Sequence, residues 1–277
     1  MKIDLHVHTN ASDGKLSPAE LVALAVSRNV GLLAIADHDT VASIAPTLEA
    51  ARQHPDLNVI PAIELSSHAP GNEVHILGYF IQHNSPELAN ELKILQDSRG
   101  ERARAIIAKL QGLGLDVSLA RVQEIAGAGS IGRPHIAQAL MEKRYVSDFR
   151  EVFDKYLGQG GPAYVERHKL TPAQAIALVL RYGGLPVLAH PTTLNLEELL
   201  PGMLTAGLVG LEVYYKDFSP ETRQDLANLA RRHHLIATGG TDYHGIEPTE
   251  VMLGEAGVPL FVAENLFALA QKKGIKI

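Results

Sequence analysis

The chain opens on Ile3-Asp4-Leu5-His6-Val7-His8, and this stretch decides how the rest of the sequence can be interpreted. Apolar and polar residues alternate along it, which is typical of a β-strand with Asp4, His6 and His8 on one face. Two imidazoles at this spacing, with Asp13 in the turn that follows, can bind one metal ion, and burying them without a partner would be costly. The opening strand is therefore predicted to contribute its polar face to a functional site.

The ends of later apolar runs repeat this pattern. Residues 32–36 end in Asp37-His38-Asp39, and similar side chains close or follow other runs: Glu64, His190, Asp242 and His244, with His75 inside the fourth run. In parallel α/β folds the carboxyl ends of the strands meet at one edge, where ligands bind. Strands are expected at residues 3–8, 32–36, 59–65, 74–80, 186–189, 209–214 and 235–238. The other histidines are expected to be solvated: His54, His68, His83, His168, His233 and His234.

Helical segments alternate with these strands for most of the chain, which favours parallel strands joined by helical crossovers. Four helices are predicted to begin at a Ser/Thr-Pro pair, at Ser17-Pro18, Ser85-Pro86, Thr171-Pro172 and Ser219-Pro220. Residues 85–162 lack a strand pattern and contain breaks at 112–114 and 127–129. We expect a barrel of residues 1–84 and 163–277, with residues 85–162 inserted as a helical cap, since such insertions commonly cover barrel sites.

Composition limits the class of protein. The 277 residues, 46% of them apolar, suit one large α/β domain with an insertion. The chain has no cysteine and 13 histidines, so any metal must be held by nitrogen and oxygen. A net charge of −6 argues against a broad grip on long nucleic acid and leaves a small anionic substrate open. No apolar run reaches the roughly 18 residues of a membrane helix. No signal peptide is recognisable, so we expect a cytoplasmic protein, and nothing indicates an obligate protein partner.

The motifs at residues 4–9, 13–14, 37–39, 64, 75, 189–191 and 241–244 resemble those of the polymerase and histidinol phosphatase (PHP) family. The resemblance implies a distorted (β/α)₇ barrel, metal-dependent phosphoester hydrolysis and a trinuclear metal centre. It implies three ligand sets: His6, His8, Glu64 and Asp242; Glu64, His75 and His190; and Asp13, His38 and His244. We expect two to three divalent ions. Some relatives use histidine where Asp13 stands, and an oxygen ligand there favours Mn²⁺ over all-zinc occupancy, with Zn²⁺ or Fe²⁺ as alternatives.

The segment Gly132-Arg133-Pro134-His135-Ile136-Ala137 resembles the TrpH/YciV-like subgroup of that family. The leading function is then a phosphatase of nucleoside 3′,5′-bisphosphates. The alternatives are a 5′→3′ exonuclease on short RNA or DNA, a histidinol phosphatase, and a PHP module that has lost catalysis and serves in binding.

Substrate-binding residues are predicted in the insertion. With Pro134 at the first position of a helix, Arg133 and His135 are expected to bind the phosphate that is not cleaved. Arg99 and Arg102 are expected to join them. Asp39 is either a proton donor to the leaving group or a partner that orients His38.

Overall fold

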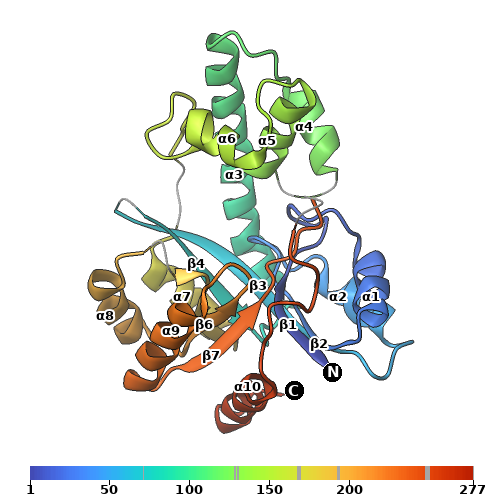
Figure 1. The fold of residues 1–277 in the computed structure, drawn as a ribbon, viewed down its shortest axis with the longest axis vertical. Helices are drawn as coiled ribbons and strands as arrows, with labels where there is room; N and C mark the ends of the chain where they lie inside the picture. The colour runs from blue at the N-terminus through green and yellow to red at the C-terminus, as the bar shows by residue number, and fades with distance from the viewer. Residues whose placement is uncertain are drawn as a thin grey trace.

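The computed structural model describes residues 1–70, 72–127, 129, 131–166, 170–191, 194–246 and 250–276. Seven strands form one sheet in chain order that curls into a nearly closed barrel, with helices around it and a helical cap above it (Figure 1). The strands are β1 (Lys2–Val7), β2 (Val30–Ile35), β3 (Asn58–Ala69), β4 (Asn72–Tyr79), β5 (Leu185–Leu188), β6 (Gly210–Tyr215) and β7 (Ile236–Gly240). Over the described ranges, no helix combines the length and apolar composition needed to cross a membrane.

All seven predicted strands are present, and the parallel pairing expected for most of the chain does not extend to β4. This strand runs antiparallel to both β3 and β5. Only two residues separate β3 from β4, which is too short for a helical crossover and permits only a hairpin. Because β4 runs antiparallel to its neighbours, it starts at the edge of the barrel where β3 and β5 end. His75 therefore lies at that edge although it is early in its strand, opposite Ser66 of β3.

The predicted helix starts are confirmed. Side chains of Ser17, Ser85, Thr171 and Ser219 each accept a hydrogen bond from a backbone amide in the first turn of the helix that follows. Around the barrel lie α1 (Pro18–Ser27), α2 (Ile44–Ala51), α7 (Pro172–Arg181), α8 (Leu196–Ala206), α9 (Pro220–Arg232) and α10 (Leu260–Lys272).

The helical cap, residues 86–157, contains α3 (Pro86–Gly112), α4 (Leu119–Ala126), α5 (Arg133–Glu142), α6 (Phe149–Val152) and a π-helical turn, η1 (Phe153–Leu157). The helices α3 and α4 end at the predicted breaks, although Ala128 of the second break lies outside the described residues.

One helix, α3, connects the barrel to the cap (Figure 1). Its first half contributes Leu88, Leu92 and Leu95 to a hydrophobic cluster shared with the barrel helices. Its second half contributes to a separate cluster within the cap: Ala103, Ile106, Ile107 and Leu110. Because the same helix enters both cores, the domain boundary placed at residue 85 stays a prediction.

The barrel closes where β1 meets the segment after β7. The backbone N–H of His8 donates to the carbonyl of Tyr243 at 2.9 Å. The Asp4 carboxylate accepts from the N–H and hydroxyl of Thr241 at 2.9 and 2.6 Å and from the N–H of Gly254 at 2.8 Å. Asp4 was expected on the same face as the histidines of β1, but β1 is irregular here and Asp4 fastens the seam instead.

At this seam Gly240 has no room for a side chain. A Cβ added there would lie 2.5 Å from the His6 nitrogen and 2.8 Å from Asp4 Oδ1. We expect Gly240→Ala to lower the free energy of unfolding by about 1–3 kcal/mol, the usual cost of overpacking. Gly112→Ala is the matched control, because no atom lies within 4 Å of that site. Urea denaturation gives the free energy of unfolding of both variants. If Gly240→Ala were as stable as the wild type, the atoms around Gly240 could move to make room for the added methyl group.

Candidate metal centre

Side chains from six of the seven strands or the turns after them converge at one edge of the barrel. Three overlapping groups have ligand atoms within 4.8 Å of one another: His8, Asp13, His38 and His244; His6, His8, Glu64 and Asp242; and His38, Glu64 and His75. The ninth predicted ligand, His190, places Nε2 3.1 Å from Glu64 Oε1. All nine side chains predicted to bind metal therefore meet in one cluster.

Glu64 lies at the centre of this cluster, and both of its oxygens face histidines. Its oxygens lie 2.8 to 3.3 Å from one nitrogen each of five imidazoles: His75, His190, His38, His6 and His8. A carboxylate has two oxygens to share, so Glu64 could hold more than one ion.

Several buried nitrogen and oxygen atoms of the cluster lack a hydrogen bond. In the part of the chain that the structure describes, these atoms are His6 Nε2, His8 Nε2, Asp13 Oδ1, His38 Nδ1, Glu64 Oε2 and His75 Nε2. Leaving so many polar atoms buried and unsatisfied is costly. All of them except His75 Nε2, which lies 3.7 Å from Glu73 Oε1, have another candidate ligand atom nearby. Divalent cations would satisfy them, and a donor set of imidazole nitrogen and carboxylate oxygen fits Mn²⁺, Zn²⁺ or Fe²⁺. The residues therefore fit a multinuclear centre.

The pKa shifts within the cluster show that its carboxylates create a negative electrostatic potential at the histidines. Burial lowers the pKa of His8, but Asp242 and Glu64 more than offset this effect and raise it to about 10. Burial also opposes charge on His75, whose pKa is nevertheless raised to about 9 by Glu64. Conversely, burial would raise the pKa of Glu64, but the histidines hold it well below its ordinary range. Carboxylates that attract protons onto histidines will attract divalent cations to the same nitrogens.

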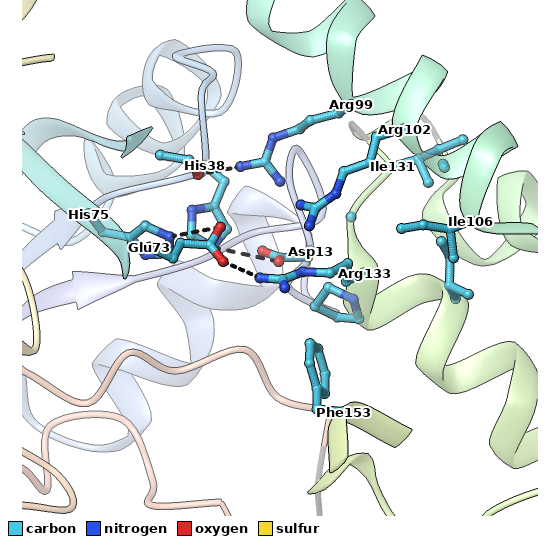
Figure 2. Close-up of a pocket in the computed structure, with 15 residues that line it drawn as sticks. Asp13, His38, Glu73, His75, Arg99, Arg102, Ile106, Ile131, Arg133 and Phe153 are labelled. Carbon is cyan, nitrogen blue, oxygen red and sulfur yellow. Dashed lines mark hydrogen bonds and ion pairs between the residues drawn. The ribbon is translucent and has the colours of Figure 1, made fainter. Parts of the chain in front are cut away.

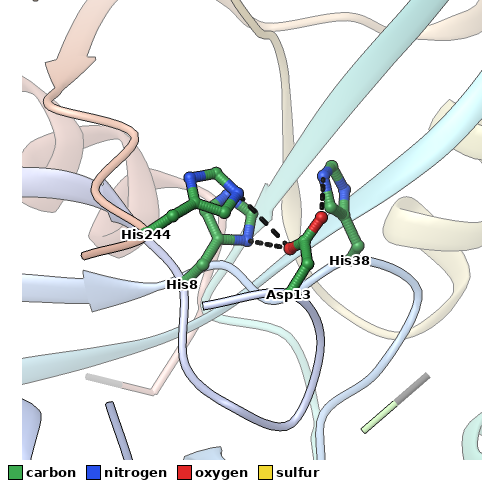
Figure 3. A group of neighbouring side chains, drawn as sticks. All are labelled: His8, Asp13, His38 and His244. Carbon is green, nitrogen blue, oxygen red and sulfur yellow. Dashed lines mark ion pairs between the residues drawn. The ribbon is translucent and has the colours of Figure 1, made fainter. Parts of the chain in front are cut away.

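Asp13 joins two sides of the centre (Figure 3). Its Oδ1 lies 3.3 Å from Nε2 of His244 and 3.8 Å from Nδ1 of His8, and its Oδ2 lies 3.7 Å from Nε2 of His38. The predicted set of Asp13, His38 and His244 is thus brought together, with His8 added to it.

A pocket joins the ligands to the cap (Figure 2). This arginine pocket is lined on the barrel side by Asp13, His38, Ser66, Glu73 and His75, and on the cap side by Arg99, Arg102, Arg133 and Phe153 among others. The three arginines predicted to bind substrate therefore face the candidate ligands across one space.

His135 lies elsewhere. Its Nδ1 accepts the N–H of Gly132 at 2.9 Å, which caps α5, and its ring lines a second cleft. This side cleft is formed by Asn10, Asp13, Gly14, Lys15, Ile125, Ala126, Gly127, His135, Gln138 and Ile246. Arg133, and not Pro134, is the first residue of the helix.

Comparison with known proteins identifies the family. The model of the PHP domain matches residues 4–166, more than half of the chain. The chain belongs to the PHP family. It is 40% identical over 247 residues to the 5′-3′ exoribonuclease Rnm of Escherichia coli, covering 87% of this chain and 84% of the relative. It is 34% identical to the 3′,5′-nucleoside bisphosphate phosphatase of Chromobacterium violaceum, covering 87% of each.

A solved structure shares the fold of this chain. An amidohydrolase from Chromobacterium violaceum, determined with bound sulfate and no metal, superposes with a TM-score of 0.87 at 32% identity, covering 97% of this chain and 96% of that chain. The chain is a metal-dependent phosphoester hydrolase with a PHP barrel. These comparisons support an enzyme over the alternative of an inactive binding module.

The histidines expected to be solvated include five that the structure describes. None of His54, His68, His83, His233 and His234 belongs to a ligand group among the described residues, and His168 lies outside them.

Sequence reasoning missed Glu212. This fully buried carboxylate on β6 lies 3.1 Å from His6 Nδ1 and accepts the N–H of His190 at 2.8 Å. It thereby turns His6 Nε2 toward the cluster and holds His190, whose φ of 24° is unusual for a residue other than glycine. A glutamate inside the apolar run of β6 was a signal that could have revealed it.

Asp37 and Glu73 also acquire definite partners. Asp37 accepts hydrogen bonds from Thr9 at 2.7 Å and from Ser12 at 2.6 Å, which fixes the turn that carries Asp13.

Glu73, two residues before His75 on the same face of β4, forms an ion pair with Arg133 of the cap. The period of two along β4 could have identified Glu73.

The number of ligands predicts the metal content. Nine candidate ligands exceed what one ion can use. We expect the purified protein to carry more than one divalent ion per chain, and chelation to abolish phosphoester hydrolysis. Elemental analysis of the active protein tests this expectation. Full activity with at most one tightly bound ion would refute a multinuclear centre.

The central carboxylate gives a sharper test. Glu64→Gln replaces one oxygen with an amide nitrogen, so the residue can no longer bridge two ions. We expect activity to fall by roughly 100-fold or more, since losing even a partner of a ligand costs about 10–100-fold. Metal content should fall as well. Glu264→Gln, on the exposed face of α10, is the matched control. Normal kcat with full metal content in Glu64→Gln would exclude bridging by Glu64.

Proposed function

We propose that this PHP hydrolase acts on nucleotides with phosphate at both the 3′ and 5′ positions, and that nucleoside 3′,5′-bisphosphates are its small substrates. The observation that carries the proposal is the arginine pocket, in which three cap arginines face the candidate metal ligands across one space. Such a pocket suits a substrate with two anionic groups. One phosphate would lie at the ligand cluster and be cleaved, while the other would be held by guanidinium groups.

The arginines are held by specific contacts. Arg99 donates from Nε to Asp39 Oδ2 and from Nη2 to Ser66 Oγ, both at 2.7 Å. Its Nη1 lies on the side of Gly132, and a guanidinium carries five N–H groups, so it can also donate to a phosphate there. Arg133 stacks over Phe153 with its central carbon 5.3 Å from the ring centre. These contacts support a preorganised grip on the uncleaved phosphate.

The reaction follows from this placement. Divalent ions in such a cluster activate water for attack and offset the charge on phosphate oxygens. A bond forms from water oxygen to phosphorus, the bond from phosphorus to the 3′ oxygen breaks, and a proton ends on that oxygen. The arginines hold the 5′ phosphate, which fixes the 3′ phosphate at the ligands.

The predicted proton donor, Asp39, has contacts that favour another role. Its Oδ1 accepts the N–H of Ser66 at 2.9 Å and its Oδ2 binds Arg99. Both oxygens thus accept hydrogen bonds that suit an ionised carboxylate. We infer that Asp39 positions Arg99, while proton donation by Asp39 stays a prediction.

A 5′→3′ exoribonuclease is the second candidate, favoured by 40% identity to the Escherichia coli enzyme of that name. The same bond to the 3′ oxygen would break in a 5′-phosphorylated RNA, releasing one nucleoside 5′-monophosphate. A screen of the metal-loaded protein against bisphosphates, mononucleotides, histidinol phosphate and short oligonucleotides separates these functions. Hydrolysis of histidinol phosphate alone would overturn both.

Arg133 provides the quantitative test. We expect Arg133→Ala to reduce kcat/KM for a 3′,5′-bisphosphate by about 2–4 kcal/mol of transition-state stabilisation, the scale for losing a charged hydrogen-bond pair. Slow hydrolysis of a simple aryl phosphate should change little, because it has no second phosphate. Arg121→Ala is the matched control, an exposed cap arginine paired with Glu142. Equal losses on both substrates would place Arg133 at the reacting phosphate, and no loss on either would remove it from the site.

A further inference from the structure

The candidate metal centre borders two spaces, and the proposed function uses only one of them. The arginine pocket lies on the side of His38 and His75. The side cleft lies between the turn after β1 and the cap helices α4 and α5, and it includes Ile246, two residues beyond His244. Asp13 lines both spaces.

Asp13 is also the ligand at which the two spaces meet. Its Oδ2 is directed at His38, which lines the arginine pocket, and its Oδ1 is directed at His244 (Figure 3). Both spaces therefore reach the candidate ligands at Asp13. A nucleotide attached through its 3′ oxygen can occupy the arginine pocket, and a second substituent on phosphorus can extend into the side cleft.

The side cleft has the chemistry of a site for a sugar–phosphate chain. Lys15 is exposed at its rim and offers a cation, while Asn10 and Gln138 offer amide groups. Nδ1 of His135 accepts the N–H of Gly132, so the ring proton is on Nε2 and this nitrogen is a donor. Ile125 and Ile246 add apolar surface for a ribose or base.

We propose that the side cleft binds the part of a single-stranded RNA that lies 3′ to the cleaved phosphate. This inference rests on the proposed function, because it requires the 5′-terminal nucleotide to be held in the arginine pocket. A bisphosphate carries only oxygen on that side of its 3′ phosphate and leaves the side cleft unused. A phosphodiester carries the next nucleotide there. The side cleft thus explains how one PHP site hydrolyses both kinds of substrate by breaking the same bond.

The test compares two substrates on the metal-loaded protein, a 5′-phosphorylated RNA hexamer and a nucleoside 3′,5′-bisphosphate. We expect Gln138→Trp, which fills the side cleft, to lower kcat/KM for the hexamer at least tenfold relative to the bisphosphate. Lys15→Ala should lower the same ratio about fivefold. Lys273→Ala, which removes an exposed lysine at the end of α10, is the matched control and should leave the ratio unchanged.

The outcomes separate this inference from the proposed function. Bisphosphate hydrolysis by each variant reports that the barrel and cap are folded. If the wild type cleaves both substrates and neither variant changes the ratio, the side cleft does not bind RNA and the proposed function stands. A wild type that hydrolyses the bisphosphate and never the hexamer also overturns the inference. Hydrolysis of neither substrate overturns the proposed function itself.

Discussion

The carboxylate of Glu64 is buried within 2.8 to 3.3 Å of nitrogen atoms from five histidines, and this contact constrains the whole barrel. The histidines come from β1, β4 and the turns after β2 and β5, so elements far apart in the chain must end at one point. Burying so many polar groups opposes folding unless each finds a partner. Metal binding and folding are therefore expected to be coupled in this protein.

Buried carboxylates serve this barrel in two ways that hydrogen bonding distinguishes. Asp4, Asp37 and Glu212 accept hydrogen bonds from amides, hydroxyls or a ligand histidine, and each fastens a seam, a turn or a ligand. Asp13 and Glu64 each keep a buried oxygen without such a bond. Satisfied carboxylates hold the architecture in place, and unsatisfied ones face the space for cations. Composition alone cannot separate the two groups, since both consist of buried acidic residues in the strands or the turns after them.

The sequence predicted best those features that follow from a short repeat of polar and apolar residues or from a local motif. Alternation marked the opening strand, apolar runs marked the other six, Ser/Thr-Pro pairs marked four helix starts, and polar residues in or after the strands marked the nine candidate ligands. Properties that depend on pairing between distant segments were not visible. The contact of Asp4 with Thr241 at the seam joins residues 237 positions apart, so the alternation along β1 could not reveal it. Glu212 was missed because its importance comes from a partner, His6, 206 positions away.

The shared helix α3 has a mechanical consequence. Its 27 residues span about 40 Å, with Leu95 anchored in the barrel core and Ala103 in the cap core. Any hinge between these two bodies must fall in the two turns between those anchors, where Gly100 weakens the helix and has open space around it. Those turns carry Arg99, which grips Asp39 and Ser66 of the barrel. A tilt of the cap about Gly100 would leave Arg99 with the barrel and move Arg133 with the cap, so it would change the shape of the arginine pocket.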